Sequence, residues 1–321
     1  MKVKYNKILP KIIVILGPTA SGKSGLAVKL AKKFGGEVIS ADSRQVYKGM
    51  DIGTAKPAKT ETEQIRHYLI DIKNPNQNYT VAQYKKDAII AIKKVLAKNK
   101  LPILCGGTGL YIKAVVDNLE IPEVKPNFRL RKKLETELQQ KGLNFLYEKL
   151  IKLDPEATYI IDKYNPRRVI RALEITFQTK KPFSSQRKKG EKIFDVLEIG
   201  LKLPPEKLKW KIEKRVDQMI KDGLIKETTN LLKKYPANLS VFDAIGYHEI
   251  INCLQGKISL SEAIRQIKSN TWHYAKRQMT WFKKPARQQP EPQAMAGGNK
   301  DIKWIEKYSE AEKLVKNFLN K

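Results

Sequence analysis

Cysteine and histidine are scarce in this chain of 321 residues, with two of the first and three of the second. Two cysteines, Cys105 and Cys253, are too few for a disulfide framework or a multi-cysteine zinc site. The histidines His67, His248 and His273 stand far apart in the sequence, which argues against a histidine-based metal centre. The sequence therefore favours a protein without disulfides and without a structural zinc ion.

Long hydrophobic runs are also missing, although 41% of the residues are hydrophobic. Nothing in the sequence reaches the roughly 18 consecutive apolar residues that a membrane-spanning helix needs. The basic N-terminus, Met1–Lys11, is followed by the apolar run Ile12–Leu16, which is too short for the core of a signal peptide. The length suits about two domains. We expect a cytoplasmic protein with no membrane partner, acting as a monomer.

Acidic residues are few relative to basic ones, with 33 Asp and Glu against 63 Lys and Arg. The net charge of +30 works against compaction, so it indicates a partner rather than a requirement of the fold. A basic excess of this size is typical of proteins that bind nucleic acid or an anionic membrane surface. A lysine-rich composition with solvated faces would give the same charge, and charge alone does not separate RNA from DNA.

Strand and helix patterns alternate in the first 120 residues. Strands are predicted at Ile12–Leu16, Glu37–Asp42 and Pro102–Cys105. Apolar residues at helical spacing predict helices over residues 22–34 and 80–99. This alternation predicts an α/β fold, a parallel sheet flanked by helices.

The pattern changes near residue 120, where the prolines Pro122 and Pro126 mark a linker. Several short helices are expected between Arg129 and Thr179, before a returning strand at Phe194–Leu201. Further helices are predicted over residues 205–223, 224–235, 259–284 and 309–319. The expected domains are a first part of the core (1–120), an all-helical insertion domain (121–193), and the completed core with its C-terminal helices (194–321), including a flexible loop at about 285–298.

Residues 17–24 match the P-loop pattern G-x-x-x-x-G-K-[ST] without a mismatch, between a predicted strand and a predicted helix. Glycines let the backbone N–H groups converge on a phosphate, and the helix N-terminus adds positive potential. Lys23 would contact phosphate oxygens, and the Ser24 hydroxyl would reach Mg²⁺. The predicted diphosphate- or nucleotide-binding residues are Gly17, Pro18, Thr19, Ala20, Ser21, Gly22, Lys23 and Ser24.

A P-loop does not identify its phosphate, and ATP is the usual ligand. Here, however, the third strand ends in glycines and not in the aspartate that typically holds Mg²⁺ in NTPases. Asp42 follows the second strand, at the sheet edge where ligands bind, so its carboxylate could accept a proton from a nucleophile or could serve as a turn residue. Gly106–Gly109, which includes Thr108, indicates either close approach of a ligand or a tight turn.

A resemblance to the bacterial tRNA dimethylallyltransferase (isopentenyltransferase) family is carried by three early motifs: Gly17–Ser24, Asp42–Pro57 and Gly106–Tyr111. Later motifs of this family are matched in order by Asn165–Glu174, Ala244–Tyr247 and Tyr274–Phe282. The similarity extends over nearly the whole chain, and the Asp42–Pro57 block is far more specific than a P-loop. The fold implied is a P-loop, kinase-like sheet with a helical insertion.

The resemblance implies transfer of a dimethylallyl group from dimethylallyl diphosphate to N6 of the adenosine 3′-adjacent to the anticodon of tRNA. Mg²⁺ is the implied cofactor, and the anticodon stem-loop is the implied RNA partner. Asp42 would be the general base for the N6 amine, and Thr108 would hydrogen-bond near the reacting centre. Lys23 and Arg215 would neutralise the leaving diphosphate.

The resemblance also implies a set of tRNA contacts. Ser43 and Gln45 would contact the adenine, which must leave its stack to be modified. Basic residues of the insertion and of the last long helix suit binding to the RNA backbone. The expected tRNA-contacting residues are Asp42, Ser43, Arg44, Gln45, Arg131, Arg167, Arg168, Arg171, Lys276, Arg277 and Gln278.

Two other functions remain open from the residues themselves. A P-loop phosphotransferase would use Asp42 as base for a hydroxyl, and it predicts tight ATP binding. A non-catalytic RNA-binding ATPase module predicts RNA affinity that survives replacement of Asp42. Consumption of dimethylallyl diphosphate separates all three functions.

Overall fold

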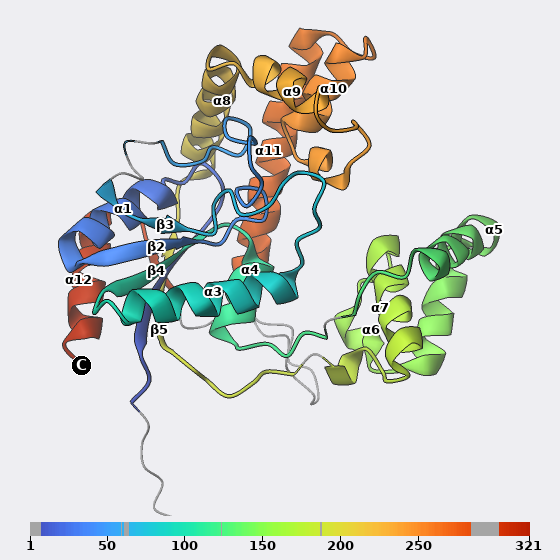
Figure 1. Ribbon diagram of the computed structural model, residues 1–321, viewed down its shortest axis with the longest axis horizontal. Coiled ribbons are helices and arrows are strands. Elements are labelled where there is room, and N and C mark those ends of the chain that lie inside the picture. Colours follow the sequence, from blue (N-terminus) through green and yellow to red (C-terminus); the bar gives the residue numbers. More distant parts are fainter. Residues whose placement is uncertain (1–7, 59, 61–63, 123, 187, 284–301) are drawn as a thin grey trace, which may run out of the picture. The chain divides into compact units, whose positions relative to one another are not determined.

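The structure is a computed structural model that describes residues 8–58, 60, 64–122, 124–186, 188–283 and 302–321 (Figure 1). Its described residues form two compact units. The first comprises residues 8–116, 192–283 and 302–321, apart from the gaps just given, and the second comprises Asp117–Glu191. The second unit covers the helices that we assigned to the insertion domain, and the loop expected at about 285–298 lies outside the described residues.

A parallel sheet forms the centre of the first unit. Among the described residues it has six strands in the order β3-β2-β4-β1-β5-β6, and every neighbouring pair is parallel. The strands are β1 (Lys11–Leu16), β2 (Gly36–Ser40), β3 (His67–Tyr68), β4 (Leu101–Gly106), β5 (Asp195–Leu201) and β6 (Lys303–Ile305). The α/β fold with a parallel sheet is therefore confirmed.

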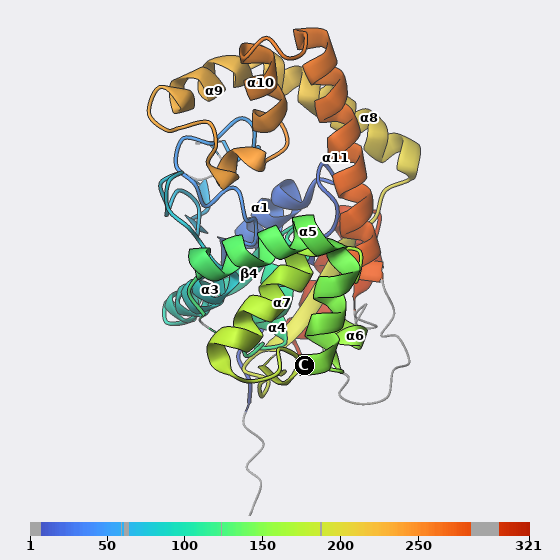
Figure 2. The ribbon, with the colours of Figure 1, turned by 90° about the vertical axis from the view of Figure 1, so that its right-hand side faces the viewer.

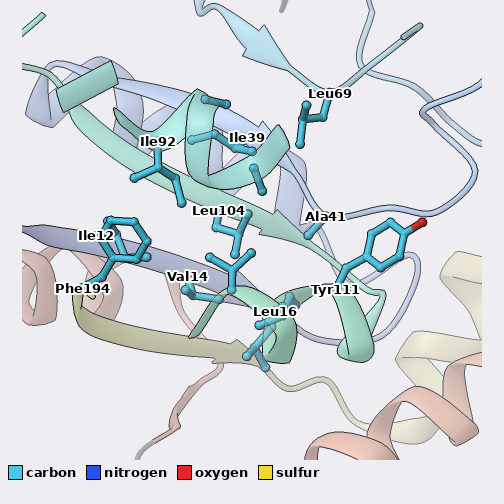
Figure 3. Packing of buried hydrophobic residues seen from close by; sticks show 14 of the residues in the cluster. Ile12, Val14, Leu16, Ile39, Ala41, Leu69, Ile92, Leu104, Tyr111 and Phe194 are labelled. Carbon is cyan, nitrogen blue, oxygen red and sulfur yellow. The ribbon is translucent and has the colours of Figure 1, made fainter. Parts of the chain in front are cut away.

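Both faces of the sheet are covered by helices, which explains why Ile12–Leu16 of the central strand β1 are all apolar. Ile12, Val14 and Leu16 of β1 pack with α3 (Val81–Leu96) and α4 (Gly109–Val116), as Figure 3 shows in part. The alternate residues of β1, Ile13 and Ile15, pack with helices on the other face, α1 (Lys23–Phe34) and α12 (Tyr308–Leu319). The period of two along β1 thus assigns each side chain to one face.

A layer of helices follows β5 and has its own apolar core. It consists of α8 (Pro205–Lys221), α9 (Leu224–Leu232), the 3₁₀ turn η2 (Ser240–Asp243), α10 (Tyr247–Leu254) and α11 (Leu260–Lys283), which lie together in both views (Figures 1 and 2). Val46, Tyr47 and Met50, from the loop after β2, are buried in the same core. The loop that carries the Asp42–Pro57 motif is thereby attached to this layer.

The second unit is helical, with a core of its own. It contains α5 (Phe128–Leu153), α6 (Ala157–Ile160), α7 (Pro166–Thr179) and the 3₁₀ turn η1 (Ser184–Gln186). The helix α5 is kinked at Gly142, which has φ 78°. Asn165 caps the start of α7, because its side chain accepts a hydrogen bond from the backbone N–H of Arg168.

A buried carboxylate stabilises this second unit. Glu174 is fully buried and accepts hydrogen bonds from the Arg131 guanidinium (2.9 Å), from Arg171 and from the backbone N–H of Asn127 (2.7 Å). Burial opposes its ionisation, but the bonds from Arg131 and Arg171 outweigh burial and lower the pKa of Glu174. The stabilisation is therefore present above the ordinary pKa of glutamate and is lost as the pH falls.

Replacing this carboxylate will destabilise the helical unit. Glu174→Gln leaves two arginines without their buried anionic partner and lowers the free energy of unfolding by about 2 kcal/mol. This loss is smaller than that for a fully buried ion pair, because each arginine side chain is about a third exposed. Urea denaturation measures the change. Glu137→Gln breaks the more exposed pair with Lys149 and serves as control, with a loss below about 1 kcal/mol. Equal losses in the two variants would contradict the prediction.

Candidate active site

The P-loop occupies the turn between β1 and α1. Gly17 (φ +142°) and Gly22 (φ +96°) adopt conformations that favour glycine, and a Cβ at Gly17 would lie 2.8 Å from the Leu201 carbonyl oxygen. Lys23, the first residue of α1, donates from Nζ to the carbonyl of Pro18, so its side chain folds back over the loop. Ser24 is exposed at the same helix end. The local structure is that of an anion cradle at a helix N-terminus.

The carboxyl ends of β2 and β4 meet beside the P-loop. The backbone N–H of Ala41 donates to Cys105 (2.8 Å), and that of Thr108 donates to Ala41 (3.2 Å). A Cβ at Gly106 would overlap the Ala41 carbonyl, so this glycine permits close approach of the protein's own backbone. The Thr108 hydroxyl then accepts from the Ser43 N–H at 3.1 Å. Asp42 and Thr108, far apart in sequence, are held next to each other.

The Asp42 carboxylate has two separate environments. Its Oδ1 accepts from the backbone N–H groups of Arg44 (2.8 Å) and Gln45 (3.3 Å), which is the turn that the sequence also allowed. No described residue donates a hydrogen bond to Oδ2, and Asp42 lines a cavity that the P-loop also lines. The turn holds the carboxylate in place, and its second oxygen is available to accept a proton.

Side chains from two helices of the C-terminal layer contact the P-loop. Arg215, on α8, donates to the Thr19 hydroxyl at 3.1 Å. Gln278, on α11, accepts from the Thr19 backbone N–H (2.8 Å) and donates to the Gly107 carbonyl (2.9 Å). The Gln278 side chain therefore bridges the P-loop and the glycine turn after β4.

These segments enclose a cavity of about 1030 Å³. Lys23 and Ser24 of the P-loop, together with Asp42, lie in its lining. Residues 51, 52 and 54–58 form another part of the wall. Side chains of α8 and α11 contribute as well: Trp210, Lys211, Lys214, Arg215, Tyr274 and Gln278. The cavity therefore joins the phosphate cradle to the carboxylate of Asp42.

The cavity is suited to a compact anion. Burial lowers the pKa of Lys23 to about 8, with Arg215 acting in the same direction and Cys105 and Asp42 opposing it. Burial also lowers the pKa of Arg215. Both cations line the cavity. Two desolvated cations fit a phosphate group, whose oxygens would supply the compensating negative charge.

A family model described as IPP transferase matches residues 45–285 of this sequence, more than half of the chain. The chain belongs to the IPP transferase family. The resemblance found on the six sequence motifs is thereby confirmed.

Curated members of the family resemble the chain along almost its full length. A protein of Acetivibrio thermocellus named tRNA dimethylallyltransferase is 43% identical over 315 residues, which cover 96% of each chain. One of Halothermothrix orenii with the same name is 44% identical over 321 residues, covering 96% of this chain and 93% of its own. The similarity therefore includes the P-loop and Asp42, which lie before the residues that the family model matches.

Solved structures of this family share the fold. The tRNA isopentenylpyrophosphate transferase of Bacillus halodurans is 36% identical, with a TM-score of 0.68 over 97% of this chain and 95% of its own. A eukaryotic dimethylallyltransferase described as acting on tRNA is 31% identical, with a TM-score of 0.77 over 97% of this chain and 77% of its own. The P-loop, kinase-like architecture expected from the sequence agrees with these structures.

Several residues expected to contact tRNA make contacts inside the protein. Arg131 and Arg171 bind Glu174, and Arg171 also donates to the Val124 carbonyl (2.9 Å). Arg44 donates from its guanidinium to the Val241 carbonyl at 3.2 Å. Gln278 is buried at the P-loop and lines the cavity.

Other members of the expected tRNA set are accessible. Arg167 and Arg168 are exposed in the first turn of α7. Lys276 and Arg277 are exposed on α11, and Lys276 lies 5.9 Å from the centre of the Trp272 ring. Among the described residues none of these four side chains takes part in an ion pair, so they keep their charges for a partner such as RNA.

The sequence assigned no role to three residues that line the cavity: Tyr274, Lys56 and Trp210. Tyr274 lies one helical turn before Gln278, which also lines the cavity, so the i, i+4 spacing on α11 was a usable signal. Lys56 is paired with Asp51 (2.6 Å) and with Asp71. No periodicity indicates the Lys56–Asp71 pair, because it joins two irregular loop segments.

The depressed pKa of Lys23 makes anion binding depend on pH. Because the pKa is about 8, the free site loses this positive charge as the pH rises above 8. Affinity for inorganic diphosphate is therefore expected to fall by up to about tenfold per pH unit between pH 8 and 9.5, since binding requires re-protonation. Calorimetric titration at several pH values measures the slope. Lys23→Met, which cannot titrate, is the control; an unchanged slope in this variant would contradict the assignment to Lys23.

Proposed function

We propose that this protein transfers the dimethylallyl group of dimethylallyl diphosphate to N6 of the adenosine 3′-adjacent to the anticodon of tRNA, acting as a monomer. The observation that carries the proposal is the position of Asp42 in the same cavity as the P-loop. A kinase-like cradle for a diphosphate and a carboxylate with an available oxygen are the two parts that such a transfer needs. The family relationship gives the reaction class.

The chain's own residues account for the steps. Lys23 and Arg215 bind the diphosphate and stabilise the negative charge that grows on it as the bond between C1 of the dimethylallyl group and oxygen breaks. The N6 nitrogen attacks C1, and Asp42 accepts the N6 proton. Thr108 holds the backbone beside Asp42 through Ser43. The products are the N6-alkylated adenosine and diphosphate.

Mg²⁺ fits this site only together with the substrate. Within the described residues there is no cluster of three or more His, Cys, Asp or Glu side chains that could hold a metal ion. The Ser24 hydroxyl lines the cavity, and Mg²⁺ characteristically takes few protein ligands together with phosphate oxygens and water. Bound in this way, Mg²⁺ would add positive charge to the leaving diphosphate.

The cavity volume and the exposed positive charges are compatible with two substrates, dimethylallyl diphosphate and tRNA. Ligand pockets commonly measure roughly 300–1,000 Å³, so a cavity of this size has room for a five-carbon diphosphate and one flipped-out base. The exposed Arg167, Arg168, Lys276 and Arg277 supply positive charge for an RNA backbone. No helix among the described residues is long and apolar enough to cross a membrane.

The test is transfer of label from labelled dimethylallyl diphosphate to unmodified tRNA in the presence of Mg²⁺. Label at N6 of the adenosine next to the anticodon supports the proposal, and its loss on chelation of Mg²⁺ supports the cofactor. If no dimethylallyl group is transferred but the protein transfers a phosphoryl group from ATP, the phosphotransferase function would replace the proposed one. ATP hydrolysis with RNA binding and no transfer would indicate the ATPase module.

A further inference from the structure

The loop after β2 needs an external support where it lines the cavity. Residues 51–53 run without regular strand or helix structure. Their three successive backbone N–H groups converge on the carboxylate of Glu227, on α9. Asp51 (3.0 Å) and Ile52 (2.8 Å) donate to Oε2, and Gly53 (3.1 Å) donates to Oε1. Such a concave arrangement of N–H groups is a typical anion site, and here the protein's own carboxylate occupies it.

Tyr247 supports the same carboxylate from α10. Its hydroxyl donates to Glu227 Oε1 at 2.6 Å, and its side chain is fully buried. Burial and the neighbouring Glu227 raise the pKa of Tyr247, so the phenol stays a donor. A Cβ at position 53 would overlap the Tyr247 ring, which explains why glycine occupies that position. Glu227, Tyr247 and Gly53 therefore form one closely fitted clamp on the loop.

The loop in turn holds Gln45. The Gln45 amide donates from Nε2 to the carbonyls of Thr54 (3.3 Å) and Ala55 (3.2 Å), and its Oε1 accepts from the Ser40 hydroxyl (3.0 Å). The Gln45 backbone N–H donates to Asp42 Oδ1. Hydrogen bonds, linked by the backbone of residues 51–55 and by the Gln45 residue itself, thus join Glu227 to the carboxylate of Asp42.

We propose that Glu227 is a positioning residue for the Asp42 carboxylate. With Tyr247 it fixes residues 51–55, these residues fix Gln45, and Gln45 fixes the orientation of Asp42 in the cavity. Glu227 itself does not line the cavity, so it acts through the other residues and not on a substrate. The inference rests on the proposed function, in which Asp42 accepts the N6 proton. Because Lys23 and Arg215 are not on this path, Glu227 influences proton removal and not the binding of the diphosphate.

The kinetic test is the variant Glu227→Gln, compared with wild type by single-turnover transfer and steady-state kinetics. The substitution places an amide NH₂ where the N–H groups of residues 51–53 and the Tyr247 hydroxyl need an acceptor, so residues 51–53 shift. We expect kcat to fall roughly ten- to a hundredfold, as a small displacement of a reacting group can cause, with the KM for dimethylallyl diphosphate unchanged. A wild-type kcat, or a loss confined to the KM of the diphosphate, would overturn the proposal.

A matched control separates positioning from general loss of stability. Glu249, on α10, is also buried and bonded twice inside the same helical layer, to the Gly246 N–H and to Asn270, both at 2.7 Å. Glu249→Gln should lower the melting temperature comparably and leave kcat within about twofold of wild type, because Glu249 bonds Gly246 and Asn270 and not the loop beside Asp42, and energetic coupling is expected only between groups that share contacts or one network. An equal fall of kcat in both variants would overturn the positioning role. Should Glu227→Gln fail to fold, Tyr247→Phe removes one hydrogen bond with its packing retained, and kcat must fall in that variant.

Amide hydrogen exchange tests the path without any substrate. In Glu227→Gln or Tyr247→Phe, the amides of residues 51–53 should exchange faster, and so should those of Arg44 and Gln45, which bond Asp42. Faster exchange confined to residues 51–53 would show that the loop does not hold the Asp42 turn, and would overturn the proposal. If wild-type protein transfers no dimethylallyl group, the proposed function has failed, and exchange still decides whether the clamp controls the Asp42 turn.

Discussion

Asp42→Asn lowers the rate of dimethylallyl transfer by roughly 10²- to 10⁴-fold, the range expected for the loss of a general base. The amide keeps an oxygen for the N–H groups of Arg44 and Gln45, so the turn is retained, but it cannot accept the N6 proton. Single-turnover transfer of label to tRNA measures the rate, and a filter-binding assay measures tRNA affinity. We expect the affinity to stay within a few-fold of wild type.

The matched control for this variant is Asp87→Asn. Asp87, on α3, accepts a hydrogen bond from the Tyr79 hydroxyl (2.8 Å) and does not line the cavity, so the same change of charge is made away from the site. Its transfer rate should remain close to that of wild type. A wild-type rate in Asp42→Asn, or a parallel loss of tRNA binding, would show that Asp42 binds and does not act as a base.

Arg215→Gln lowers the rate of dimethylallyl transfer by roughly 10²- to 10³-fold, because it removes a desolvated positive charge that stabilises the leaving diphosphate. The arginine also orients the P-loop through Thr19, so affinity for dimethylallyl diphosphate should weaken as well. Single-turnover rates and calorimetric binding of inorganic diphosphate measure the two effects separately.

Lys209→Gln provides the control for Arg215, since it removes one positive charge from an exposed position on the same helix. A charge at a solvent-exposed position is screened, so it adds little to the electrostatic potential at a distant diphosphate. Its rate should therefore match that of wild type at moderate salt. Similar losses in both variants would mean that the overall charge of the protein, and not the local contact, controls diphosphate binding.

Much of the fold could be predicted because its signals are local. The apolar strand β1, the P-loop and α1 follow one another within a short segment, and each has its own pattern. The strands β3 and β6 were missed, since two and three residues are too short to show a period. The helix α10 was missed as well; it begins after Gly246 at φ 99°, a conformation that no pattern indicated.

The candidate site divides in the same way. Lys23, Ser24 and Asp42 were predicted because each stands at a strand end or a helix start. The contact of Arg215 with Thr19 and the bridge made by Gln278 depend on side chains separated by 196 and 259 residues. Their positions follow from how α8 and α11 pack, which sequence spacing does not report.

The sequence by itself determined the parallel α/β fold, the phosphate cradle and, through its motifs, the family. The tertiary structure decided which charges are used inside the protein and which remain for a partner: Arg131 and Arg171 bind the buried Glu174, whereas Arg167 and Arg168 on the same helix α7 as Arg171 remain exposed. It also decided that Glu227 supports the loop beside Asp42. The physical reason is that local patterns record the conformation of neighbouring residues, whereas the partner of a polar side chain depends on which distant segments pack against it.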